Sequence, residues 1–150
     1  MPSGKHQLDI DIPIERMWDF VSDMDNWAPL VPGYIDHEKM NGRQSKWKFK
    51  GDTGIIRKTV SLRIDITEWK EPTTVAFNLT GLTENFVGSG YFQAEKKKHS
   101  TSMTGCLQIT AKGLAGPMVN SVLKSYVPKT TKEFTKAVAE KMTEGRRVTN

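Results

Sequence analysis

The sequence predicts one α+β domain, in which a curved sheet of seven antiparallel strands wraps around a single long C-terminal helix. Apolar side chains recur at helical steps of three and four from about residue 115 to residue 144. Residues 34–111 instead alternate between apolar and polar side chains, which is typical of strands. A lone amphipathic helix after a run of strands needs a sheet to cover its apolar stripe.

Length and composition indicate one folded domain that spans residues 1–150. The hydrophobic fraction is 37% and the charged fraction 26%, which fits a globular protein rather than a disordered chain. A single Cys provides neither an internal disulfide nor a multi-Cys metal site. Because no apolar run is long enough to span a membrane and no signal-peptide core is visible, we expect a cytoplasmic location.

The first thirty residues predict a strand followed by two short helices. Residues 8–12 alternate apolar and acidic side chains, as in a half-buried strand. Pro13 ends this strand and begins a helix, because its fixed φ suits a first helical turn and Glu15 favours a helix N-terminus. A second short helix around Trp27 ends at Val31-Pro32-Gly33. We expect these two helices to close one end of the sheet.

Six further strands are expected between these two short helices and the long C-terminal helix. Asn41-Gly42 is a strong hairpin signal, and residues 51–54 mark another turn. Gly88 and Gly90 predict a bend or a bulge in a strongly curved sheet. Since short turns join successive strands, neighbouring strands pair antiparallel.

The long helix begins after a Gly-Pro break and contains an internal proline. Gly116 interrupts the chain and Pro117 provides a helical φ for the first turn. Pro128 lies inside the periodic pattern, where it removes the hydrogen bond to the Lys124 carbonyl and predicts a kink.

Four stretches resemble a known family. They are residues 12–20 (Ile-Pro-Ile-Glu-Arg-Met-Trp-Asp-Phe), Val31-Pro32-Gly33, residues 86–90 (Phe-Val-Gly-Ser-Gly) and residues 113–116 (Gly-Leu-Ala-Gly). In this order the chain resembles the carbon monoxide dehydrogenase G-subunit family, within the START/polyketide-cyclase/Bet v 1-like superfamily, whose fold is the helix-grip. The resemblance implies a hydrophobic cavity between sheet and helix that binds a lipid-like or polyketide-like ligand. For the named family it implies an isoprenoid quinone and a membrane-associated molybdenum hydroxylase as partner.

The inward faces of the predicted elements supply the side chains for such a cavity. We expect the ligand-binding residues to be Trp27, Val31, Trp47, Phe49, Leu62, Ile64, Phe77, Phe92, Leu107, Ile109, Met118, Val122 and Tyr126. A solid core would have the same sequence pattern, so the cavity itself is expected from the fold analogy. Tyr126, Trp27 and Trp47 would offer a hydroxyl or an indole N–H to a polar headgroup.

Catalytic chemistry has little support in the sequence. The three His residues show no ligand spacing, Cys106 has no base near it in sequence, and no phosphate-binding loop, dinucleotide fingerprint or nucleophile elbow is present. We therefore expect a binding or transport protein with no catalytic residue, cofactor or metal. Two alternatives remain open: an accessory or assembly subunit that acts through protein contacts, and an enzyme of the cyclase or hydrolase kind.

The basic residues allow one hypothesis about a surface. The net charge is +5, which favours acidic partners. Lys46, Lys48 and Lys50 share the outer face of one strand, with Arg57 and Lys58 near them in the next. Such a stripe would contact anionic membrane headgroups, although a merely solvated sheet edge has the same pattern. No nucleic-acid recognition motif is present, so nucleic acid is not an expected partner.

Overall fold

The computed structural model describes residues 2–50 and 59–148. In chain order its elements are β1 (Ser3–Ile10), α1 (Ile14–Val21), α2 (Met24–Trp27), the 3-10 helix η1 (Ala28–Leu30), β2 (Tyr34–Lys39), β3 (Gln44–Lys50), β4 (Thr59–Lys70), β5 (Thr74–Gly81), β6 (Phe86–Lys96), β7 (Thr101–Ala111) and α3 (Gly116–Val148). This order confirms the predicted α+β arrangement. The turn expected at residues 51–54, Arg57 and Lys58 lie outside the described residues.

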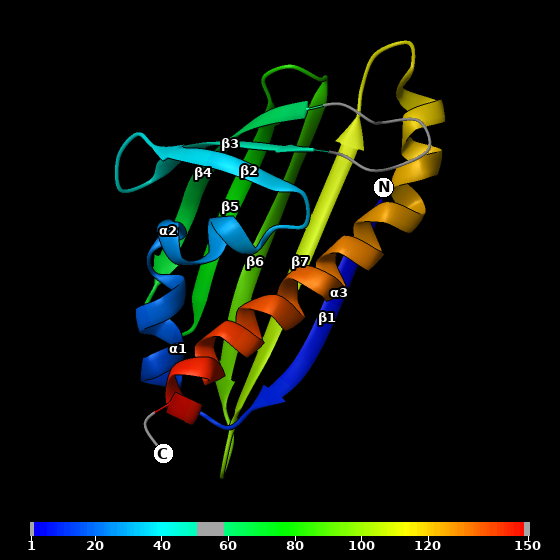
Figure 1. The fold of residues 1–150 in the computed structure, drawn as a ribbon. Coiled ribbons are helices and arrows are strands. Elements are labelled where there is room, and N and C mark those ends of the chain that lie inside the picture. The colour runs from blue at the N-terminus through cyan, green and yellow to red at the C-terminus, as the bar shows by residue number, and fades with distance from the viewer. Residues whose placement is uncertain (1, 51–58, 149–150) are drawn as a thin grey trace.

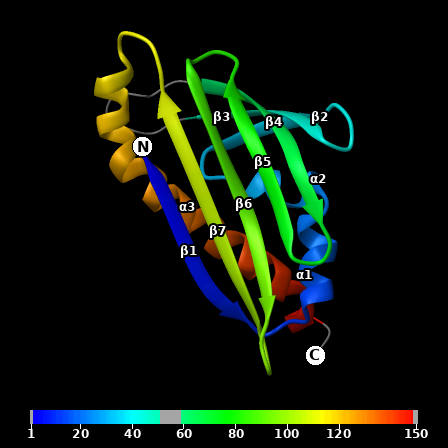
Figure 2. The same ribbon diagram turned by 180° about the vertical axis from the view of Figure 1, so that it is seen from behind.

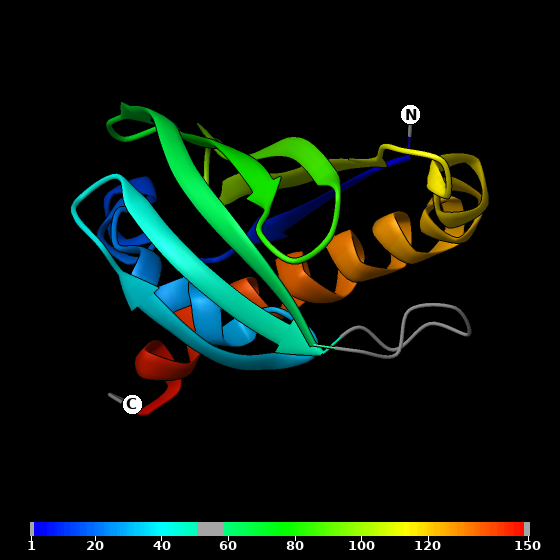
Figure 3. The ribbon, with the colours of Figure 1, turned by 90° about the horizontal axis from the view of Figure 1, so that it is seen from above.

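The strands form one antiparallel sheet in the order β1-β7-β6-β5-β4-β3-β2. Spatial order follows chain order except that β1 pairs with β7, so β1 and β2 occupy opposite edges. The sheet curves around α3, and α1 and α2 lie at one end of the concave side (Figure 1). Seen from behind, β1, β7 and β6 cross in front of α3 (Figure 2). The view from above shows β2 and β3 folding back toward α3 (Figure 3).

Helix α3 lies directly on β1 and β7 because glycines allow its backbone to approach. A Cβ atom at Gly105 would overlap the Thr135 hydroxyl, and one at Gly4 would lie 2.7 Å from the Pro128 Cα. The start of α3 is fixed by Asn120, whose side chain accepts from the Ala111 N–H (2.8 Å) and donates to the Ala111 carbonyl (3.0 Å). The helix continues through Pro128 and bends after its first turns (Figure 1).

Of the bend or bulge predicted at Gly88 and Gly90, the bulge is absent. Strand β6 keeps a continuous register with both β5 and β7, and the sheet irregularities lie instead at Tyr34/Asp36 and at Ile66/Glu68. Gly90 has a packing role, because a Cβ atom there would lie 2.6 Å from the Phe77 ring.

The core is centred on Trp27, which is 0% exposed. Its ring makes aromatic contacts with the rings of Trp47, Phe77, Phe92 and Phe134, with centroid separations of 5.3–6.3 Å. Its indole N–H donates to the Val21 carbonyl at 2.9 Å. These contacts anchor α2 in the hydrophobic core. Within the described ranges no helix combines the length and apolar character needed to cross a membrane.

Candidate functional site

A small apolar cavity lies between the concave face of the sheet and α3. Its volume is about 60 Å³. Its lining consists of Val31, Trp47, Phe49, Leu62, Ile64, Phe77, Leu79, Leu107, Ile109, Tyr126, Thr130 and Phe134. The alternation of strands β3, β4, β5 and β7 turns their apolar side chains inward. On α3 the three lining residues are spaced by four and therefore share one helical face.

Most of the residues predicted from the sequence lie in this lining. They are Val31, Trp47, Phe49, Leu62, Ile64, Phe77, Leu107, Ile109 and Tyr126. Sequence reasoning missed Leu79, Thr130 and Phe134. The signals were present, because Leu79 follows Phe77 by two in a strand, and Thr130 and Phe134 follow Tyr126 by four and eight in a helix.

The structure places the other four predicted residues outside the lining. Trp27 and Phe92 are buried in the adjoining core. Val122 is half-buried, and Met118 is 59% exposed near the start of α3. The first turns of α3 pack on Ala111 through a neighbouring face, which carries Val119, Leu123 and Val127.

The two tryptophan N–H groups expected to meet a ligand already have partners within the protein. Trp47 donates to the Ser45 hydroxyl at 3.0 Å, and Trp27 donates to the Val21 carbonyl at 2.9 Å. A headgroup contact with either indole would have to replace this partner, and the contact itself stays a prediction. A buried N–H group needs an acceptor whether or not a ligand is bound, and here the chain supplies it.

A wider and more polar cleft adjoins the cavity. It has a volume of about 450 Å³. Its lining contains Pro32, Gly33, Lys50, Tyr126, Lys129, Thr130 and Glu133. Tyr126 and Thr130 line both spaces, so the cleft and the cavity meet at these two residues of α3.

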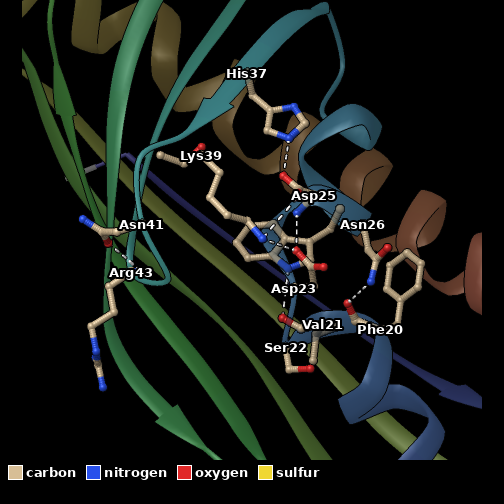
Figure 4. A network of polar contacts seen from close by, with 12 residues as sticks. Phe20, Val21, Ser22, Asp23, Asp25, Asn26, His37, Lys39, Asn41 and Arg43 are labelled. Atoms are coloured by element: carbon tan, nitrogen blue, oxygen red, sulfur yellow. Dashed lines mark hydrogen bonds and ion pairs between the residues drawn. The ribbon is translucent and has the colours of Figure 1, made fainter.

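A network of polar side chains holds α2 against β2 (Figure 4). The Tyr34 hydroxyl lies 2.6 Å from His37 Nδ1, and His37 Nε2 lies 2.7 Å from Asp25 Oδ1. Lys39 Nζ reaches Asp23 Oδ1 at 2.9 Å and Asp25 Oδ2 at 3.2 Å. The hydrogen bond with His37, aided by Lys39, lowers the pKa of Asp25. Hydrogen bonds to Asp23 and Asp25 raise the pKa of Lys39.

This network lies apart from the cavity lining and links α2 to β2. It joins the helix that carries Trp27 to the strand that follows Pro32 and Gly33 in the cleft wall. Spacing along the chain gave no role to His37, because its carboxylate partner lies 12 residues away on another element. Among the described residues, no cluster of three or more His, Cys, Asp or Glu side chains could hold a metal ion.

A protein-family model with the description "-like:-like" matches residues 1–145, which is nearly the whole chain. The chain belongs to this family. Its fold is the helix-grip fold, and solved structures of the START/Bet v 1-like superfamily share it. A comparison with curated proteins finds no match.

Three of the similar solved structures show how far this likeness extends. A START superfamily protein from Mycobacterium smegmatis is 16% identical with a TM-score of 0.72, over 95% of this chain and 97% of that chain. Ara h 8.0201 is 18% identical with a TM-score of 0.63, over 99% of this chain and 98% of that chain. The di-domain ARO/CYC StfQ from the steffimycin biosynthetic pathway is 12% identical with a TM-score of 0.65, over 97% of this chain and 51% of that chain. At these identities the likeness shows the helix-grip fold. Membership of the carbon monoxide dehydrogenase G-subunit family stays a prediction.

Proposed function

We propose that this helix-grip protein binds or transports a hydrophobic small molecule, a lipid or an isoprenoid quinone, whose apolar part occupies the cavity between the sheet and α3. The observation that carries the proposal is the lining, in which every residue except Tyr126 and Thr130 is aliphatic, tryptophan or phenylalanine. Transfer of a ligand's apolar surface from water into such a lining is favourable by about 25 cal/mol per Å².

The size of the two spaces determines how a ligand would be held. A cavity of about 60 Å³ admits only a few atoms, whereas small-molecule sites commonly measure about 300–1,000 Å³. The adjoining cleft of about 450 Å³ falls in that range. A ligand therefore enters through the cleft and enlarges the cavity by turning a side chain of its lining. Phe134 is a suitable moving part, because it lines the cavity one turn of α3 beyond Thr130 and is only half-buried.

The resemblance to the carbon monoxide dehydrogenase G-subunit family supports a more specific version of the proposal. In that version the ligand is a quinone, and the protein serves a membrane-associated molybdenum hydroxylase. Lys46 and Lys48 are exposed on the outer face of β3 while Trp47 points inward. This exposure supports a contact with an anionic membrane surface as part of the proposal.

Titration with the neutral fluorophore N-phenyl-1-naphthylamine tests ligand binding. We expect its emission to rise and shift to the blue on binding, and the Leu107→Trp variant, which fills the cavity, to weaken binding at least about tenfold. The matched control is Leu114→Trp, because Leu114 is fully exposed and outside the lining. The absence of a saturable signal, or equal binding by both variants, would overturn the proposal.

The natural ligand is identified by native mass spectrometry of protein purified from its own host, followed by organic extraction. A stoichiometric quinone would support the more specific version. Another stoichiometric lipid would support binding but remove the reason to expect a molybdenum hydroxylase as partner.

A further inference from the structure

The cleft beside the cavity brings together two lysines from distant parts of the chain. Lys129 lies on α3, and Lys50 is the last residue of β3. Alternation along the strand predicted Lys50 on the outer face with Lys46 and Lys48, but at the end of β3 it lines the same cleft as Lys129. Within residues 2–50 and 59–148, neither ammonium group forms an ion pair. Glu133 is the one acidic side chain among the described lining residues. The described lining thus carries an excess of one positive charge, in a protein with a net charge of +5.

Thr130 adds a polar group at the junction between the cleft and the cavity. The residue is 8% exposed, and it lines both spaces. The hydroxyls of Thr131 and Thr135 each donate to the carbonyl four residues earlier at 2.7 Å. Among the hydrogen bonds of the described residues, the Thr130 hydroxyl has none. A ligand atom at this junction would give the Thr130 hydroxyl a hydrogen-bond partner.

We propose that the cleft binds the carboxylate headgroup of a single-chain, fatty-acid-type amphiphile whose tail enters the cavity. This inference rests on the proposed function, because the same cavity must accept the tail. Lys50 and Lys129 form charge-assisted hydrogen bonds with the carboxylate, and Thr130 donates to the oxygen nearest the cavity. The charged groups lie in the cleft and the apolar side chains in the adjoining cavity. An amphiphile has the same division between a charged headgroup and an apolar tail. It favours a charged ligand over a neutral quinone.

A series of ligands with the same tail tests the headgroup. Decanoate, 1-decanol and decylamine are used to displace N-phenyl-1-naphthylamine at pH 7.5 and low salt. We expect decanoate to bind about tenfold more tightly than decanol, as two partly exposed charge contacts would give. Decylamine should bind most weakly, and added NaCl should reduce the affinity for decanoate while leaving that for decanol unchanged.

Variants assign the effect to the cleft. The double variant Lys50→Gln/Lys129→Gln should bind decanoate no better than decanol, with the affinity for decanol unchanged. The double variant Lys46→Gln/Lys48→Gln removes the same charge from the outer face and should behave as the parent protein. The Thr130→Val variant should weaken decanoate binding several-fold. An unchanged far-UV circular dichroism spectrum and an unchanged unfolding midpoint show that each variant is folded.

Two failures have different meanings in this experiment. If decanoate and decanol bind equally well and the cleft variants change neither, the headgroup inference is overturned while hydrophobic binding stands. If neither the fluorophore nor any member of the series binds, the proposed function fails and this inference fails with it.

Discussion

The Nε2 atom of His37 lies 2.7 Å from the Oδ1 atom of Asp25, and this contact joins strand β2 to helix α2. The His37 side chain is 14% exposed, and its other ring nitrogen meets the Tyr34 hydroxyl. Because α2 also carries the buried Trp27, the contact helps to hold α2 over the hydrophobic core. Its strength should be visible in the pH dependence of stability.

The Asp25→Asn variant should be less stable than the parent protein at neutral pH, by about 0.5–1 kcal/mol, as for an exposed charged pair. The hydrogen bond with His37 lowers the pKa of Asp25 in the folded state below its ordinary value of 3.8. A lowered carboxyl pKa gives a stability contribution that is fully present above the unfolded pKa and is lost as the pH falls through the folded pKa. Urea unfolding between pH 7 and pH 2 measures the difference.

The expected curve is therefore a constant gap between the two proteins down to about pH 4, which closes at lower pH. Asp36→Asn is a suitable control, because Asp36 is exposed on β2 next to His37. This variant should show a smaller stability difference from the parent protein. A gap for Asp25→Asn that widens on acidification would contradict this origin of its stability.

Gly105→Ala should destabilise the protein by about 1–3 kcal/mol, because the added methyl group overlaps the Thr135 hydroxyl where α3 lies on β7. The double variant Gly105→Ala/Thr135→Ala removes that hydroxyl, so it should be more stable than the sum of the two single changes predicts. Gly42→Ala is the control, since nothing lies within 4 Å of its Cβ position. Additive free energies of unfolding would show that this contact does not limit the approach of the helix.

Thr101→Val should lower the free energy of unfolding by about 1–3 kcal/mol. The Thr101 hydroxyl is buried and donates to the Ile12 carbonyl at 2.7 Å. Valine keeps the shape but leaves that carbonyl without its donor. Thr104→Val, at a half-buried position on the same strand, should change stability by less, as measured by thermal or urea unfolding. Equal losses for the two variants would mean that β-strand packing, and not the hydrogen bond, is responsible.

Trp27→Phe should cost about 2–4 kcal/mol, because it removes buried volume and leaves the Val21 carbonyl without the indole N–H. Trp69→Phe provides the comparison. Trp69 is half-buried and makes an edge contact with Trp18 at a centroid distance of 6.4 Å, so its loss should cost clearly less. Chemical unfolding monitored by far-UV circular dichroism avoids the altered fluorescence, and a smaller loss for Trp27 than for Trp69 would contradict its central role.

Local periodicity in the sequence was sufficient to assign most helices and strands, and to tell which face of most strands turns inward. It placed the first strand at residues 8–12, whereas β1 runs over Ser3–Ile10. These features depend on periods of 3.6 and 2 residues, which are visible within a single segment. Alternation over residues 45–50, for example, predicted that Trp47 points inward and Lys46 outward, as the structure shows. Periodicity gave no signal for the close approach of α3 at Gly4 and Gly105. The residues that each glycine contacts lie on α3, far away in the sequence, so the glycine's own segment does not reveal them.

Features that depend on the pairing of distant segments emerged only in the folded chain. Packing selected the α3 face that carries Tyr126, Thr130 and Phe134 for the cavity, and left Met118 exposed. It gave the tryptophan N–H groups partners within the chain, joined His37 to Asp25, and placed Lys50 and Lys129 in the lining of one cleft. Periodicity fixes the direction of a side chain relative to its own backbone. The volume of a cavity and the charge of a cleft depend on how several such backbones pack together.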